Sequence, residues 1–134
     1  MNHATIEAAA YIFERESGRI LSDEEGVIVA SSEYSSLSEN EVQARLEDYI
    51  LTRIETTDPF VSGCIWALGK RANKENVVFF KTILRDCIDL DVRLAYQAMI
   101  ALDNLGENIL PASSSMFDDE VNYSAGKQYL GRSV

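Results

Sequence analysis

The chain has 134 residues and a formal net charge of −10, because 22 Asp and Glu side chains are set against 12 Lys and Arg. The length suits one domain, the hydrophobic fraction of 46% excludes wholesale disorder, and the acidity excludes nucleic acid and anionic membrane surfaces as partners. No apolar run approaches the roughly 20 residues of a membrane span and no secretory signal pattern follows Met1, so we expect a cytoplasmic protein.

Two helices are predicted in the first half of the chain. The first covers residues 4–16, and the second covers residues 38–56, where Ser38 and Glu41 form a capping box. The Gly- and Ser-rich segment between them contains a short apolar run at 27–29, which we predict to be a buried loop anchor or a brief strand. The apolar faces of the helices consist of Ile6, Ala9, Ala10 and Phe13 in the first and Val42, Leu46, Tyr49, Ile50 and Ile54 in the second.

Helical spacing continues through the second half. One helix opens at Asp58, whose carboxylate is expected to cap it, and runs to about Gly69. Two more are predicted over residues 74–88 and 90–105. The remainder of the chain is polar, so we expect a loose or only partly docked tail at 113–134.

A shift of the sequence by 31 residues aligns the segment that starts at Asp58 with the segment that starts at Asp89. Both segments contain an aspartate, a valine three residues later, and small residues that precede an aliphatic residue. This pattern resembles a HEAT repeat over about residues 58–105. The chain departs from the family at Ser62, where Arg is usual, and at Ile100, where Gly is usual. The other matched pairs are Val61 with Val92, Cys64 with Ala95, Ile65 with Tyr96, Ala67 with Ala98, and Leu68 with Met99.

The resemblance implies an all-α fold, in which HEAT-like helix pairs stack into a short right-handed superhelix. Residues 1–112 would then form a single helical domain, with a diverged pair at 4–56, HEAT-like pairs at 58–105 and the polar tail at 113–134. The alternative is a compact bundle of the same helices.

No set of side chains in the sequence demands a reaction. The only histidine, His3, lies in a terminal segment, which disfavours nucleophile systems that need a histidine and zinc sites that need about four N or S ligands. Cys64 and Cys87 lie on apolar helix faces and are predicted to be free, buried thiols. We therefore predict that the protein is not an enzyme and holds no cofactor and no metal.

Two aromatic side chains fall outside the apolar stripes of their helices. Trp66 points away from its stripe, and Phe79 shares a side with Glu75 and Asp86, so we expect both aromatics to be exposed. Exposed aromatic residues are typical anchors of protein interfaces, and these four residues are therefore candidates for partner binding. Trp66 can alternatively pack against a preceding helix pair.

The negative charge is concentrated at the two ends of the chain. Residues 1–57 carry −8 and residues 89–134 carry −4, on either side of a middle segment of +2. These flanks either hold a basic partner or form a solvated coat. The acidic candidates for partner binding are Asp23, Glu24, Glu25, Asp118, Asp119 and Glu120.

Small, acidic, HEAT-like chains resemble bacterial immunity proteins, which neutralise a cognate toxin that is commonly a basic nuclease. The resemblance implies a cytoplasmic inhibitor that binds a basic toxin domain tightly and occludes its active site, and that is monomeric alone or 1:1 with its partner. The alternative is a HEAT-like scaffold or adaptor subunit of a larger protein assembly. An enzyme that acts on a cofactor-bearing protein is a third alternative, which requires a carboxylate-lined pocket.

Overall fold

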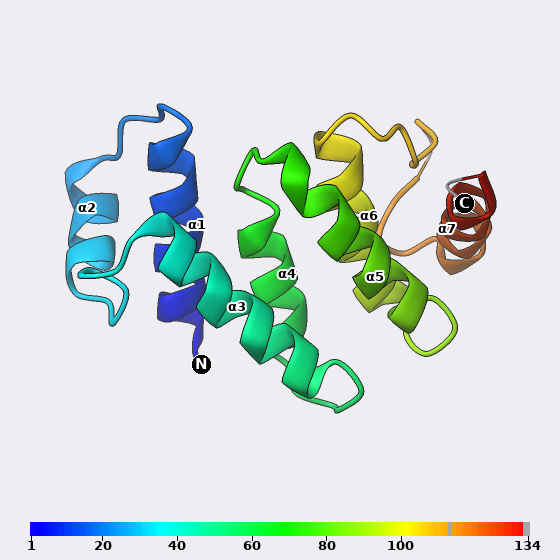
Figure 1. The fold of residues 1–134 in the computed structure, drawn as a ribbon, viewed down its shortest axis with the longest axis horizontal. Coiled ribbons are helices and arrows are strands. Elements are labelled where there is room, and N and C mark those ends of the chain that lie inside the picture. Colours follow the sequence, from blue (N-terminus) through cyan, green and yellow to red (C-terminus); the bar gives the residue numbers. More distant parts are fainter. Residues whose placement is uncertain (113, 133–134) are drawn as a thin grey trace. The chain divides into compact units, whose positions relative to one another are not determined.

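The computed structural model describes residues 1–112 and 114–132, and the regular elements in these ranges are all helical (Figure 1). The predicted all-α class is therefore confirmed. The chain divides into two compact units, Met1–Ala72 and Asn73–Val134. Within the described residues, the first unit contains four α-helices, and the second contains a short 3-10 helix followed by three α-helices.

The first unit is built around α1, His3–Glu16, which contacts every other helix of the unit. These are α2, Asp23–Ala30, then α3, Glu39–Arg53, and α4, Val61–Leu68. Helix α4 also packs against α3, whereas α2 contacts α1 alone. The largest fully buried side chains of this unit are Phe13, Leu46, Ile50, Ile65, Leu68, Val42 and Val61.

Helix α2 replaces the loop anchor or brief strand predicted at 27–29. A capping box fixes its first turn: the Ser22 hydroxyl accepts from the backbone N–H of Glu25 at 3.2 Å, and the Glu25 carboxylate accepts from the backbone N–H of Ser22 at 2.9 Å. Three acidic residues in that turn also favour the positive end of the helix dipole. Together with the burial of Val29, these effects outweigh the strand preference of the β-branched run.

The entry into α4 also differs from the prediction. The helix begins at Val61 with Phe60 as its N-cap, and not at Asp58. The Asp58 carboxylate instead holds the turn before the helix, since it accepts a hydrogen bond from the Tyr49 hydroxyl at 2.6 Å and from the Phe60 backbone N–H at 2.8 Å. These two bonds, the Tyr49 bond first, lower the pKa of Asp58.

A buried arginine joins two helices at the end of the first unit. Arg71 is only 9% exposed, and its guanidinium lies over the Phe13 ring. It donates to both carboxylate oxygens of Glu16 at 2.9 Å, to Gln43 at 2.8 Å and to Asn40 at 2.9 Å. One side chain therefore connects the C-terminal end of α1 to the first half of α3.

The second unit is centred on α6, Val92–Asn104, which packs against both α5, Val77–Cys87, and α7, Asp119–Arg132. The predicted helix at 74–88 begins as the 3-10 helix η1, Lys74–Asn76, before it continues as α5. The largest fully buried side chains here are Phe80, Ile83, Leu84, Met99 and Leu102.

Helix α7 occupies most of the segment predicted as a loose polar tail at 113–134; residue 113 and residues 133–134 lie outside the described residues. The helix approaches its neighbours closely at Gly126, where an added Cβ would stand 2.8 Å from Ile88 Cδ1. Its buried face also includes Asn122, which accepts from the Ser114 hydroxyl and donates to the Ser115 carbonyl at 2.7 Å. The tail is therefore part of the second unit.

The 31-residue repeat has a physical counterpart, because α4 and α6 begin at the matched valines, Val61 and Val92. The helix pairs in contact include α3 with α4 and α5 with α6, but α4 also packs against α1, and α6 also packs against α7. The boundary between the two units falls within the segment 58–88, so α4 and α5 belong to different units.

Candidate functional site

The acidic first turn of α2 presents two carboxylates to solvent. The capping box employs Glu25, whose carboxylate also pairs with Arg19 at 2.6 Å, and this arrangement lowers the pKa of Glu25, with the Ser22 backbone bond as the main cause. Asp23 and Glu24 are exposed, and neither forms a hydrogen bond or an ion pair with the described residues through its carboxylate. Of the three predicted candidates in this turn, two are therefore available to a partner.

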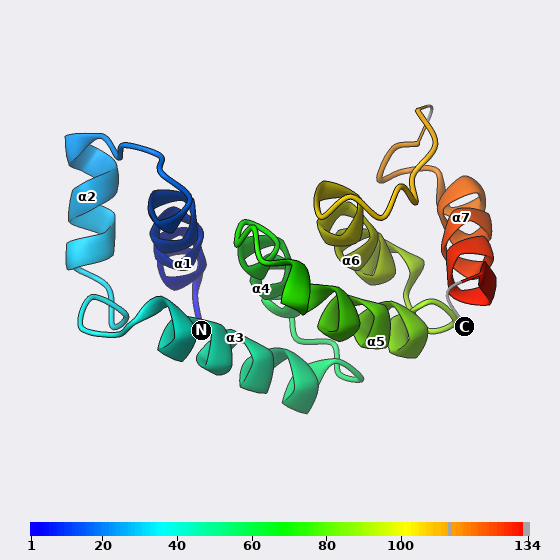
Figure 2. The same cartoon turned by 45° about the horizontal axis from the view of Figure 1, so that its top comes forward.

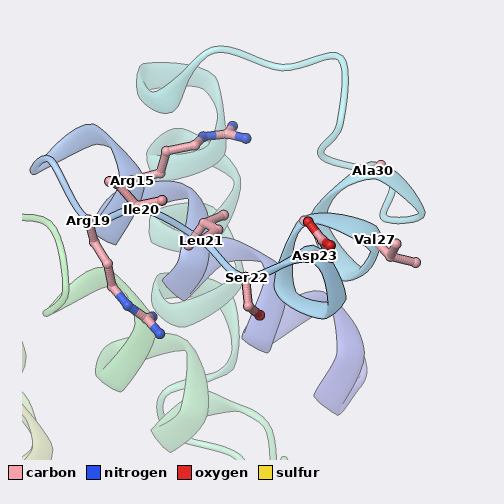
Figure 3. A pocket seen from close by; sticks show the side chains of 9 residues that line it. Arg15, Arg19, Ile20, Leu21, Ser22, Asp23, Val27 and Ala30 are labelled. Carbon is pink, nitrogen blue, oxygen red and sulfur yellow. The ribbon is translucent and has the colours of Figure 1, made fainter.

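A groove of about 660 Å³ lies beside these carboxylates (Figure 3). Its apolar lining comes from the turn after α1 and from α2, and its most exposed members are Ile20, at 92%, and Val27, at 63%. Figure 3 shows Arg15 and Arg19 on one side of this groove and Asp23 and Val27 on the other. A hollow of about 630 Å³ lies along the other edge of α2, and its lining residues are Met1, Asn2, Ala4, Thr5, Val27, Ile28, Ser31, Ser32 and Glu33.

The first unit carries most of the negative charge. It contains 13 acidic and 6 basic side chains, a net charge of −7, against 9 and 6 in the second unit, a net charge of −3. Only four of the 13 carboxylates form ion pairs with the described residues, and they belong to Glu14, Glu16, Glu25 and Asp58. Nine unpaired carboxylates therefore remain in a unit of 72 residues, which gives it a strong negative field.

The two predicted aromatic anchors differ in exposure. Trp66 on α4 is 40% exposed, as predicted, and the Lys70 ammonium lies 5.0 Å from its ring centroid. Phe79 on α5 is half-buried, and its ring packs edge-to-face on Phe80 with the ring centroids 5.9 Å apart. Phe79 is thus less exposed than its helix position predicts.

The other acidic candidates lie in the second unit, around α5 and α7. Glu75 and Asp86 are exposed, as their helix position predicts. Asp118 accepts from the Val121 backbone N–H at 3.2 Å and so caps α7, while Asp119 lies 3.6 Å from the Arg93 guanidinium. Glu120 alone of the cluster Asp118, Asp119 and Glu120 forms no hydrogen bond or ion pair with the described residues through its side chain.

Of the residues that line the groove, only Asp23 was a candidate from the sequence, and the groove's most exposed large apolar residues, Ile20 and Val27, were missed. The signal that reveals Val27 is Ser22 with Glu25 three residues later, a capping-box spacing that starts a helix at Asp23, whereas Ile20 lies in the turn before this helix. Once that helix is drawn, Asp23 and Val27 fall on one face at i and i+4.

Both cysteine side chains lie in the core. Burial raises the pKa of both the Cys64 and the Cys87 thiol to about 12, so neither is a reactive thiolate, and both are free cysteines. Among residues 1–112 and 114–132, no three His, Cys, Asp or Glu side chains are placed to hold a metal ion. In the same ranges, no helix combines the length and the apolar character needed to cross a bilayer.

Comparison of the chain with protein-family models, with curated proteins and with solved structures gave no match.

Proposed function

We propose that the protein is a protein-binding inhibitor, an immunity protein that neutralises a cognate basic toxin such as a nuclease effector by occluding its active site. The observation that carries the proposal is the excess of unpaired carboxylates in the first unit beside an exposed apolar groove. In the finer detail of the fold, we propose a short right-handed superhelix of helix pairs, with a diverged pair at 4–56 and HEAT-like pairs at 58–105.

The acidic field and the groove have separate roles in this proposal. The net charge of −7 on the first unit accelerates the encounter with a basic protein and takes the place of nucleic-acid phosphates near its cleft. The apolar groove then supplies the desolvated contact that slows dissociation. Inhibition by binding requires no reaction, so no catalytic group and no cofactor is assigned.

The test is coexpression with the product of the neighbouring open reading frame. We expect a 1:1 complex in light scattering, survival of cells that otherwise die from that product, and an association rate that falls steeply as salt is added. If the neighbouring product is harmless, or kills equally in the presence of the protein, the proposal is wrong.

A second candidate function is that of a scaffold or adaptor subunit. It is favoured by exposed apolar side chains in the second unit, where Val78 is 72%, Leu90 is 69% and Phe117 is 73% exposed. An adaptor requires a complex with at least two different proteins at the same time, whereas the inhibitor requires one. Size-exclusion chromatography with light scattering of the complex isolated from the native cells distinguishes the two.

A further inference from the structure

Helix α2 has an outward face that no other helix of its unit covers. Figures 1 and 2 both show α2 beside α1, and α1 is the only helix it contacts. Only Val29 of this helix is buried, while Asp23, Val27 and Ala30 are exposed at i, i+4 and i+7. Because α2 packs against its own unit through one side only, its other side is available to a partner.

The shape of this face suits another helix. Ile20, Val27 and Ala30 contribute exposed apolar side chains to the lining of the groove of about 660 Å³. Gly26 also lines the groove, and a Cβ built on it meets no heavy atom within 4 Å. The small residues Gly26 and Ala30 therefore let a second backbone approach α2 closely, while Ile20 and Val27 provide the apolar contact.

The charges at the groove decide which partner fits. The Arg19 guanidinium is engaged by Glu14 and Glu25, so that its charge is compensated within the unit. Of the unpaired carboxylates, Asp23 lines the groove and Glu24 follows it in the chain, and the whole unit carries −7, which disfavours a second copy of the same chain through like-charge repulsion. Arg15 is a single unpaired cation at the opposite side and does not reverse this excess.

We propose that the outward face of α2 is a docking surface for an amphipathic, lysine- or arginine-bearing helix of the partner protein. The apolar side of that helix lies on Ile20, Val27 and Ala30, and its cationic side chains face Asp23 and Glu24. Because α2 has 8 residues, it spans about 12 Å, so the contact takes roughly two turns of the docked helix. The inference rests on the proposed function, for which it names the binding face.

Three synthetic peptides of about four helical turns test the surface directly. One is an amphipathic Leu/Lys helix, the second has Glu in place of every Lys, and the third has the Leu/Lys composition in scrambled order. Each is titrated into the full chain labelled with nitrogen-15. We expect the Leu/Lys helix to shift the backbone amides of residues 20–30, and the other two peptides to leave them in place.

Matched variants decide whether the groove itself binds. Gly26→Trp adds a large side chain at the groove from a position where a Cβ meets nothing within 4 Å, and Gly131→Trp adds the same side chain on α7, where a Cβ also meets nothing within 4 Å. We expect Gly26→Trp to weaken the Leu/Lys helix by about tenfold or more and Gly131→Trp to leave its affinity unchanged. A second pair removes charge alone: Asp23→Asn with Glu24→Gln is expected to weaken binding several-fold, whereas Asp48→Asn with Glu55→Gln is not.

The inference is overturned if the Glu-bearing or the scrambled peptide shifts residues 20–30 equally, if the shifts map elsewhere, or if both tryptophan variants bind alike. These results are independent of toxin neutralisation. If the peptide binds in the groove but no toxin is neutralised, the proposed function fails and the docking surface stands. If a toxin is neutralised equally by Gly26→Trp, the docking surface fails and the proposed function stands.

Discussion

The close approach of α7 at Gly126 predicts a measurable cost for any larger side chain there. In Gly126→Val, the Cβ stands 2.8 Å from Ile88 Cδ1 and 3.1 Å from Met99 Sδ, and two further methyl groups extend from it. Overpacking of this kind costs about 1–3 kcal/mol, and the better helix propensity of valine returns about 0.3 kcal/mol. We expect the free energy of unfolding of the second unit to fall by about 1–2.5 kcal/mol.

Gly131→Val on the same helix is the matched control, because a Cβ at Gly131 meets nothing within 4 Å. It makes the same chemical change without the overpacking and is expected to alter stability by less than about 0.5 kcal/mol. Urea unfolding followed by circular dichroism gives the two free energies, and hydrogen exchange of the α7 amides locates the loss. Equal effects of the two substitutions, or a gain in stability from Gly126→Val, would refute the packing of α7 described above.

Three further predictions concern single contacts. Arg71→Met removes the hydrogen-bond donors to Glu16. We expect the free energy of unfolding of the first unit, measured in urea, to fall by about 2–3 kcal/mol; the loss is limited because the Glu16 side chain is one-third exposed and water can solvate it. A change below about 0.5 kcal/mol would contradict the buried network. The bonds from Lys127 and Tyr123 lower the pKa of Asp89. The stability that these bonds confer is therefore complete above the ordinary pKa of an aspartate and is lost as the pH falls through the lowered value. Lys127→Met should raise the pKa of Asp89 in an NMR titration, and an unchanged pKa would exclude the ion pair between Lys127 and Asp89. Burial raises the pKa of Cys64 to about 12, so at mildly alkaline pH a thiol reagent should label it far more slowly in the folded protein than in urea; equal rates would contradict its burial.

The helices that the sequence predicts are those whose buried face is apolar at regular spacing. Phe80, Leu84 and Cys87 on α5 are an example, and all three are buried. Helix α7 was missed because its buried face consists of Asn122, Gly126 and Tyr129, which have the right spacing but no aliphatic pattern. Burial there comes from close backbone approach and from hydrogen bonds, neither of which hydropathy reports.

The candidate site was predictable only in part, for a related reason. The exposure of Trp66 follows from its position on the helix, which points its side chain away from the apolar stripe. Asp23 and Glu24 belong to a run of acidic residues with no basic residue among them, which is consistent with the absence of an ion pair between either side chain and the described residues. The exposure of Ile20 depends on how the turn after α1 leaves the core, and an apolar residue in a turn carries no periodic signal. Likewise, the half-buried state of Phe79 reflects its contact with Phe80 next in the chain, which a helical-wheel projection places elsewhere.

The aspartates of the 31-residue repeat are held by the same kind of clamp in both units. Asp58 accepts from the hydroxyl of Tyr49 and lies 3.7 Å from Arg53. The equivalent contacts of Asp89 are made by a tyrosine and a lysine that are likewise four residues apart, at 2.8 Å and 2.9 Å.

In the first unit the helix that supplies this tyrosine and cation, α3, precedes the aspartate in the chain, whereas in the second unit the helix, α7, follows it. The clamp on the aspartate is thus the same whichever way the clamping helix is connected, although the turns differ: Phe60 caps α4 in a helical conformation, whereas Asp91 caps α6 in an extended one with its own carboxylate. What holds the aspartate is therefore a tyrosine and a cation four residues apart on a helix packed beside it, and not the order of the helices along the chain.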